Sequence, residues 1–183
     1  EEIDGWIKAG LEGASDWVLI GGPPCQAYSL AGRSRRTRES QEKFESDEKH
    51  FLYREYLRII RRFAPTVFVM ENVKGMLSST HGGSPIFDRI IEDLSRPGPD
   101  LSYEIRSLVV PGTAETLEPQ DFVIEAERFG VPQGRHRVIL FGVRSDAAKK
   151  SKKLVIDQAR FTLQNTNDPV SVGEALSGLP PIR

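Results

Sequence analysis

Short, continuous apolar runs are the most prominent pattern along this chain. The runs at 17–20, 66–70 and 138–143 have the length of strands and are bounded by glycine, proline or charged residues. A strand that is buried on both faces lacks polar alternation, so these runs predict strands inside a covered sheet. Weaker runs at 102–110 and 122–124 predict two further strands.

Apolar residues at helical spacing occupy several of the segments between these runs. The pattern predicts helices over 1–14, 50–63 and 86–94, and a short helix over 170–176. Pro65 ends the second of these helices. Alternation of strands and helices favours an α/β fold whose sheet is mostly parallel and flanked by helices.

Composition and the sequence of the first residues narrow the class of protein. The chain has 183 residues, 38% of them hydrophobic and 28% charged, which is typical of one globular domain. No apolar run approaches the roughly 20 residues of a membrane span, and the acidic opening residues do not resemble a secretion signal. A single cysteine cannot form an internal disulfide, which favours the cytoplasm.

The single cysteine, Cys25, directly follows the first predicted strand and the Gly-Gly-Pro-Pro turn at 21–24. Composition alone favours a small buried hydrophobe, the usual role of an isolated cysteine. Its position indicates another role, because α/β folds bind ligands at the carboxyl ends of their strands. The placement suits a nucleophile.

Two other strand ends carry polar residues. Glu71 follows the run at 66–70, and Arg135 and Arg137 lead into the run at 138–143. Taken singly, the glutamate suits a helix start and the arginines suit a solvated surface. Taken together with Cys25, they comprise a nucleophile, an acid and a pair of cations.

A long polar connection follows Cys25 and extends to about residue 49. It contains four arginines within six positions, at 33–38. Such charge runs are usually solvated surface, and this one also suits contacts to phosphates.

In these motifs the sequence closely resembles the DNA cytosine-5 methyltransferase family. Residues 22–29, Gly-Pro-Pro-Cys-Gln-Ala-Tyr-Ser, are similar to its Pro-Cys-Gln nucleophile motif. Glu-Asn-Val at 71–73 matches a second family motif, and Gln-Gly-Arg-His-Arg at 133–137 fits the Gln-x-Arg-x-Arg pattern. The three motifs occur in the family's order across about 16–144.

The resemblance implies a catalytic role for each motif. The thiolate of Cys25 would add to C6 of cytosine, Glu71 would act at N3, and Arg137 would contact O2. Arg135 would support the site or a phosphate. The target base would be rotated out of the duplex. Substrate or DNA contacts are implied for seven further residues near the motifs: Gln26, Ser29, Arg33, Arg35, Arg36, Asn72 and Gln133.

The methyl donor of this family is S-adenosylmethionine, and the resemblance implies that this chain has part of the family's Rossmann-like methyltransferase fold. The family's Phe-x-Gly-x-Gly loop and its acidic strand end do not occur here, so we expect the N-terminal donor-binding strands to be missing. Leu52, Pro23 and Pro24 remain as expected donor contacts. Residues 1–145 are expected to form a catalytic core segment, and 146–183 a connector toward an absent target-recognition domain.

Several interpretations remain open. The chain is expected to be a fragment or one subunit of a split DNA-modification enzyme, inactive on its own and with a complementary segment as partner. A free-standing active methyltransferase is the least favoured interpretation. A tRNA cytosine-5 methyltransferase shares the same catalytic core. A non-catalytic DNA-binding piece of a larger assembly would use the arginines at 33–38 and not Cys25. A thiol hydrolase would need a histidine base, and the three histidines have no recognisable hydrolase context.

Overall fold

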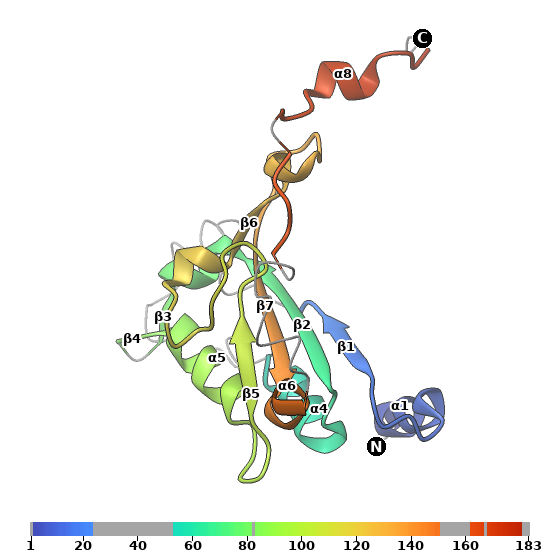
Figure 1. Cartoon of the computed structure of the whole chain (residues 1–183), viewed down its shortest axis with the longest axis vertical. Helices are drawn as coiled ribbons and strands as arrows, with labels where there is room; N and C mark the ends of the chain where they lie inside the picture. The colour runs from blue at the N-terminus through green and yellow to red at the C-terminus, as the bar shows by residue number, and fades with distance from the viewer. Residues whose placement is uncertain (1, 24–52, 82, 151–161, 167, 181–183) are drawn as a thin grey trace, which may run out of the picture.

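The computed structural model describes residues 2–23, 53–81, 83–150, 162–166 and 168–180 (Figure 1). The helices of these residues are α1 (Glu2–Leu11), α4 (Tyr53–Phe63), α5 (Ile86–Ser95), α6 (Ser145–Lys150) and α8 (Val172–Leu176). The strands are β1 (Val18–Gly21), β2 (Val67–Val73), β3 (Thr80–His81), β4 (Ser84–Pro85), β5 (Tyr103–Arg106), β6 (Val123–Glu125) and β7 (His136–Arg144). Short 3-10 helices are η2 (Lys74–Ser78), η3 (Pro119–Phe122) and η4 (Ala126–Phe129). None of the helices in the described ranges is long and apolar enough to cross a membrane.

The main sheet has the strand order β1-β2-β7-β5, and β6 pairs with the first residues of β7. β1 and β2 are parallel, whereas β7 is antiparallel to β2, β5 and β6. The expectation of an α/β fold is confirmed, but that of a mostly parallel sheet is wrong for the strand pairs described here. The cause is β7, which runs opposite to its neighbours. A buried strand has the same hydrophobic pattern in either direction.

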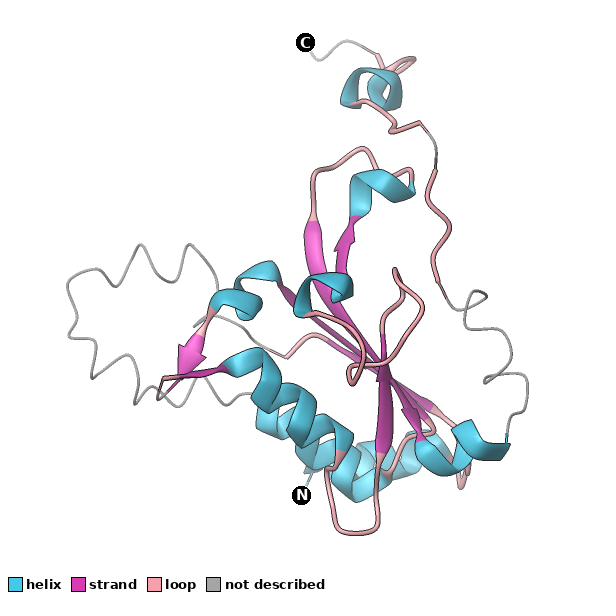
Figure 2. Ribbon diagram, turned by 60° about the vertical axis from the view of Figure 1, so that its left-hand side comes forward, coloured by secondary structure: helices cyan, strands magenta, loops and turns pink. Residues whose placement is uncertain are grey.

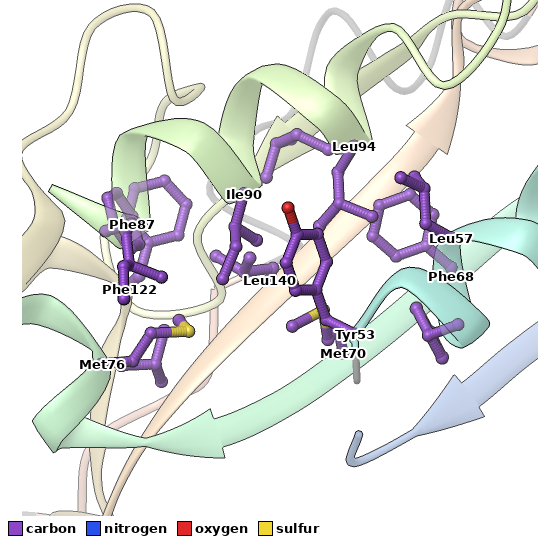
Figure 3. Packing of buried hydrophobic residues seen from close by; sticks show 14 of the residues in the cluster. Tyr53, Leu57, Phe68, Met70, Met76, Phe87, Ile90, Leu94, Phe122 and Leu140 are labelled. Atoms are coloured by element: carbon purple, nitrogen blue, oxygen red, sulfur yellow. The ribbon is translucent and has the colours of Figure 1, made fainter. Parts of the chain in front are cut away.

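Helices cover one face of this sheet (Figure 2). Along β2 the residues alternate, so that Phe68, Met70 and Asn72 are buried while the residues between them are only half-buried. The buried face packs against α4 and α5, whose side chains fill the core shown in Figure 3. Tyr53 of α4 donates a hydrogen bond to the Asp93 carboxylate of α5 at 2.5 Å, which links the two helices.

The N-terminal helix α1 is attached to α4 by charge. Its buried Asp4 accepts from Arg58 Nη1 at 2.8 Å and pairs with Arg62 Nε at 2.8 Å. The apolar residues Ile3 and Trp6 of the same helix are exposed, at 52% and 66%. Ion pairs therefore help to attach α1 to α4, because much of the apolar surface of α1 is not buried.

Acid is expected to loosen α1 before the core unfolds. The hydrogen bond from Arg58 lowers the pKa of Asp4 from its ordinary value of 3.8. A carboxyl whose pKa is lower in the folded state stabilises that state above its unfolded pKa, and the effect is lost as pH falls through the folded pKa. The protection factors of the α1 amides, which compare their exchange with the intrinsic rate at the same pH, should fall over that range. Asp4→Asn should show fast exchange already at neutral pH and Glu2→Gln should not; slow exchange in Asp4→Asn would contradict the prediction.

Most of the predicted elements are present, with shifted limits. α1, α5 and α8 correspond to the helices expected over 1–14, 86–94 and 170–176, and α4 covers the described part of the helix expected over 50–63. The strand expected over 102–110 ends at Arg106. An irregular segment follows, and an isolated antiparallel bridge pairs Arg106 with Thr113. The helix α6, whose Ala148 is buried, was not predicted.

Candidate active site

The parallel pair β1 and β2 brings the turn after β1 against Glu71. Gly21 is the register partner of Met70, so the residues that follow these two positions leave the sheet side by side. A Cβ atom on Gly22 would lie 3.0 Å from Glu71 Oε2, so the backbone of this turn lies close to the Glu71 side chain. Pro23, the next residue, is buried. The turn that leads toward Cys25 therefore begins beside the Glu71 carboxylate.

Two arginines reach the same carboxylate from β7 and the turn before it. Glu71 Oε1 lies 2.8 Å from Arg137 Nε and 3.7 Å from Arg135 Nη2. The register explains this meeting: Arg137 pairs with Val73 and Glu71 with Ile139, so Glu71 and Arg137 are diagonal neighbours on one face. Arg135 is two residues earlier and is therefore directed to the same side.

The contact between Arg137 and Glu71 is an ion pair without hydrogen-bond geometry. Arg137 Nε is buried and has no hydrogen-bond partner, although the Glu71 oxygen is close. Arg137 Nη1 donates instead to the His136 carbonyl at 2.7 Å. The Glu71 and Arg137 side chains are 39% and 26% exposed, so the pair is open to solvent. The arrangement combines a carboxylate, two cations and an accessible surface.

Comparison with known proteins shows the family of this chain. A family model described as C-5 cytosine-specific DNA methylase matches residues 12–177. This chain belongs to that family. The Type II methyltransferase M.Bpa9945I of Bacillus paralicheniformis is 34% identical over 168 residues, which cover 91% of this chain and 33% of the relative. M.BspRI of Lysinibacillus sphaericus, also a Type II methyltransferase, is 35% identical over 129 residues, covering 70% of this chain and 24% of the relative.

A solved structure supports the fold. A DNA modification methyltransferase encoded within a prophage (E. coli) superposes with a TM-score of 0.58 at 25% identity, covering 97% of this chain and 39% of the other. The chain spans about a quarter to two fifths of the length of these methylases. The structure thus describes part of the methylase architecture.

The structure brings three of the predicted methylase residues together and separates two others from them. Glu71, Arg135 and Arg137 meet, although β2 continues to Val73 and β7 already begins at His136, so Glu71 and Arg137 lie inside strands and not beyond their ends as predicted. Asn72 does not join them: it lies on the opposite, buried face of β2, is 2% exposed, and its Oδ1 accepts from the Val73 amide at 2.9 Å. Gln133 is exposed in the turn before β7, where its backbone amide donates to the Val131 carbonyl.

The side chain of Asn72 is thus buried beside the Val73 amide at the end of β2. Its contact to DNA remains a prediction. A further eight predicted site residues lie outside the described residues: Pro24, Cys25, Gln26, Ser29, Arg33, Arg35, Arg36 and Leu52.

Sequence reasoning missed one polar contact next to the two arginines. His136 Nε2 lies 2.7 Å from Glu127 Oε1, across the turn that connects η4 to β7. A histidine between the two arginines of the Gln-x-Arg-x-Arg pattern is a visible signal, but its partner is nine residues away and belongs to no motif. A cavity of about 540 Å³ lies elsewhere, against β5, and is lined by Arg96, Arg106 and Glu115 among others.

Proposed function

We propose that this chain carries the catalytic residues of a DNA cytosine-5 methyltransferase, which methylates a cytosine rotated out of the duplex. The observation that carries the proposal is the meeting of Glu71, Arg135 and Arg137 beside the turn after β1. Cys25 follows Pro23 by two residues, and two residues of chain span about 7 Å at most. The sequence therefore supplies a thiol within reach of the carboxylate.

The reaction needs a nucleophile because C5 of cytosine is unreactive while the ring is aromatic. In the proposed mechanism, the Cys25 thiolate forms a bond to C6, and the electron pair moves toward N3 and makes C5 nucleophilic. S-adenosylmethionine would supply the methyl group: C5 would bond to the methyl carbon as the methyl–sulfur bond breaks, and S-adenosylhomocysteine would leave. Loss of the C5 proton then restores the double bond and expels the thiolate. The free Cys25 thiolate is thereby regenerated.

Glu71 and Arg137 have complementary roles in this proposal. Negative charge develops on N3 when C6 is attacked, and a carboxyl at N3 neutralises it by donating a proton or a hydrogen bond. A guanidinium at O2 stabilises the same charge. Arg137 suits this role because its Nε has no hydrogen-bond partner in the structure. Arg135 lies 3.7 Å from Glu71 and is the more exposed of the two arginines, which suits support of the carboxylate or a phosphate contact.

Glu71→Gln is expected to slow methyl transfer by about 10²- to 10⁴-fold, the range typical of general acid–base catalysis. Glutamine has the size of glutamate but has no proton to give to N3. The measurement is single-turnover methyl transfer to DNA by the active enzyme. The matched control is Glu92→Gln, on the exposed surface of α5. An unchanged rate in Glu71→Gln would contradict the assigned role.

The described residues form only part of a donor site. Pro23, two residues after the end of β1, is the one predicted donor contact that the structure describes. The fit to S-adenosylmethionine is therefore incomplete in these residues. We propose that the donor site is completed by other parts of the enzyme, including Pro24 and Leu52.

An uncovered region of the sheet supports a complementary segment as partner. Within the described residues, β1 pairs with β2 alone, and its Val18 and Ile20 are 55% and 75% exposed. An edge strand with exposed apolar side chains tends to pair with further chain. Residues 1–145 would then be the catalytic core segment, and 146–183, which include α8, would lead toward a target-recognition domain.

The relatives named Type II methyltransferases support a restriction-modification context, and a DNA substrate supports the cytoplasm as the location.

Two measurements test the proposal. Calorimetric titration of S-adenosylmethionine shows whether this chain binds donor by itself or needs the complementary segment. DNA that contains 5-fluorocytosine then reports catalysis, because fluorine at C5 cannot leave as a proton does and the cysteine adduct persists.

A denaturation-resistant adduct with such DNA, dependent on donor, is the expected result. Transfer to tRNA and not to DNA would favour the tRNA enzyme. Salt-sensitive DNA binding without any adduct, after donor binding has been restored, would favour a non-catalytic DNA-binding role.

A further inference from the structure

The turn between η4 and β7, which carries both arginines to Glu71, is fastened by a side-chain contact on its other side. His136 Nε2 and Glu127 Oε1 are 2.7 Å apart, and each side chain is about one-third exposed. Arg137 of β7 and Arg135 in the turn before it both lie near Glu71, whereas His136, between them, contacts Glu127. The Glu127–His136 contact can therefore affect the positions of the two arginines without itself contacting Glu71.

His136 also contacts Arg137 directly through its backbone. The His136 carbonyl accepts from Arg137 Nη1 at 2.7 Å, and Arg137 Nε in turn lies 2.8 Å from Glu71. A continuous series of contacts thus extends from Glu127 through His136 and Arg137 to Glu71. A shift of His136 would move the acceptor that orients the Arg137 guanidinium.

The turn lies at the surface: residues 131–135 are exposed, and none of the residues of η4 is buried. Four backbone hydrogen bonds lie within it, from the amides of Ala126, Val131, Gln133 and Arg135 to the carbonyls of Arg135, Ala126, Val131 and Gln133. Thr166 also donates to the Arg128 carbonyl of η4 through its amide and its hydroxyl. The Glu127–His136 pair adds a side-chain contact that joins η4 to the first residue of β7.

Charge strengthens the Glu127–His136 pair. The hydrogen bond from His136 lowers the pKa of Glu127, so the carboxylate remains ionised at neutral pH. The second carboxylate oxygen, Oε2, is buried without a hydrogen-bond partner, which leaves His136 as its main counterpart. Charges on the adjoining elements are Glu125 of β6, which is opposite His136 and pairs with Arg128 at 2.6 Å, and Lys74, the first residue of η2 after β2.

We propose that Glu127 is a positioning residue which, through His136, holds Arg135 and Arg137 against Glu71 and the incoming base. The proposal rests on the methyltransferase function proposed above. Glu127 touches neither substrate nor reacting atoms. Its effect is to keep the Arg137 guanidinium oriented toward the position where negative charge develops on the base.

Kinetics of the active enzyme test this role. Glu127→Ala should lower kcat for methyl transfer about tenfold, because a displacement well below 1 Å already misdirects a catalytic group, and should change KM for DNA less than twofold. Glu127→Gln should restore most of the rate, since its amide oxygen still accepts from His136. Glu115→Ala, at an exposed position outside the turn, is the matched control.

A double-mutant cycle separates positioning from general stability. If Glu127 acts through Arg137, the tenfold effect of Glu127→Ala should disappear in an Arg137→Ala background. An effect of full size in that background, or a loss in Glu127→Ala that follows only its melting temperature, would overturn the proposal.

A spectroscopic measurement keeps this inference separate from the proposed function. In the 183-residue chain, the ¹⁵N NMR signal of Arg137 Nε–H should shift or broaden in Glu127→Ala and remain unchanged in Glu115→Ala. An Arg137 signal insensitive to Glu127→Ala would overturn the positioning role, whatever the activity. Absence of methyl transfer by the unmutated enzyme would instead overturn the function while leaving this readout intact.

Discussion

Cys25→Ser is expected to abolish the covalent adduct with 5-fluorocytosine DNA. A cysteine thiol has a pKa near 8.5, lower beside cationic groups, so a useful fraction is thiolate at neutral pH. A serine hydroxyl is essentially never ionised there and adds to C6 far more slowly. The measurement is the protein band of retarded mobility on a denaturing gel after incubation with donor and DNA.

The sequence provides an unusually clean control for this experiment. Cys25 is the single cysteine of the chain, so no second thiol can form the adduct when it is replaced. Binding of the same DNA without donor should be unchanged in Cys25→Ser, because a hydroxyl is similar in size to a thiol. An adduct that survives the substitution would mean that the nucleophile is another residue or another subunit.

The closeness of Glu71 and Arg137 could be predicted from sequence because each adjoins an apolar run of strand length. The structure places Glu71 Oε1 2.8 Å from Arg137 Nε, although both residues lie inside their strands, since β2 continues to Val73 and β7 begins at His136. The positions of Cys25 and of the arginines at 33–38 remain predictions, since they lie outside the described residues.

The direction of a strand and the face of the sheet on which a side chain lies were harder to predict from the sequence. β7 is as apolar as a parallel strand, and only its pairing with β2 and β5 shows that it runs the other way. Glu71 and Asn72 belong to β2 because β7 continues to pair with them. A strict alternation carried on from Phe68 and Met70 would have placed Asn72 on the buried face. The motif favoured a DNA contact, whereas the alternation gives the correct side.

The Glu127–His136 contact shows a different limit. Both residues are polar, half-buried and separated by a turn whose path the sequence does not determine. Family motifs identify the residues that touch the substrate, but the residues that orient them depend on the local turn. Such contacts become visible only when the register of β6 and β7 is known.

Gly142→Ala is expected to lower the free energy of unfolding by about 3 kcal/mol, at the upper end of the usual cost of overpacking a core. Gly142 of β7 is the register partner of Phe68 of β2, and the Phe68 ring lies over it. A Cβ on Gly142 would lie 2.2 Å from two ring carbons. Phe68 is fully buried, between Tyr56 and Tyr103 at ring-centroid distances of 6.2 Å and 5.1 Å, and has no room to retreat.

Urea denaturation of the chain measures this cost. Gly10→Ala, in α1, is the matched control because a Cβ there meets nothing within 4 Å, and alanine favours a helix over glycine by up to about 1 kcal/mol. Phe68→Leu in the Gly142→Ala background should recover part of the loss, since the smaller side chain frees the space that the new methyl group needs. A change below about 0.5 kcal/mol in Gly142→Ala would mean that β2 and β7 separate easily. The carboxylate on β2 and the arginines leading into β7 would then not be held in fixed relation by this sheet, because their meeting depends on the same register as the Phe68–Gly142 contact.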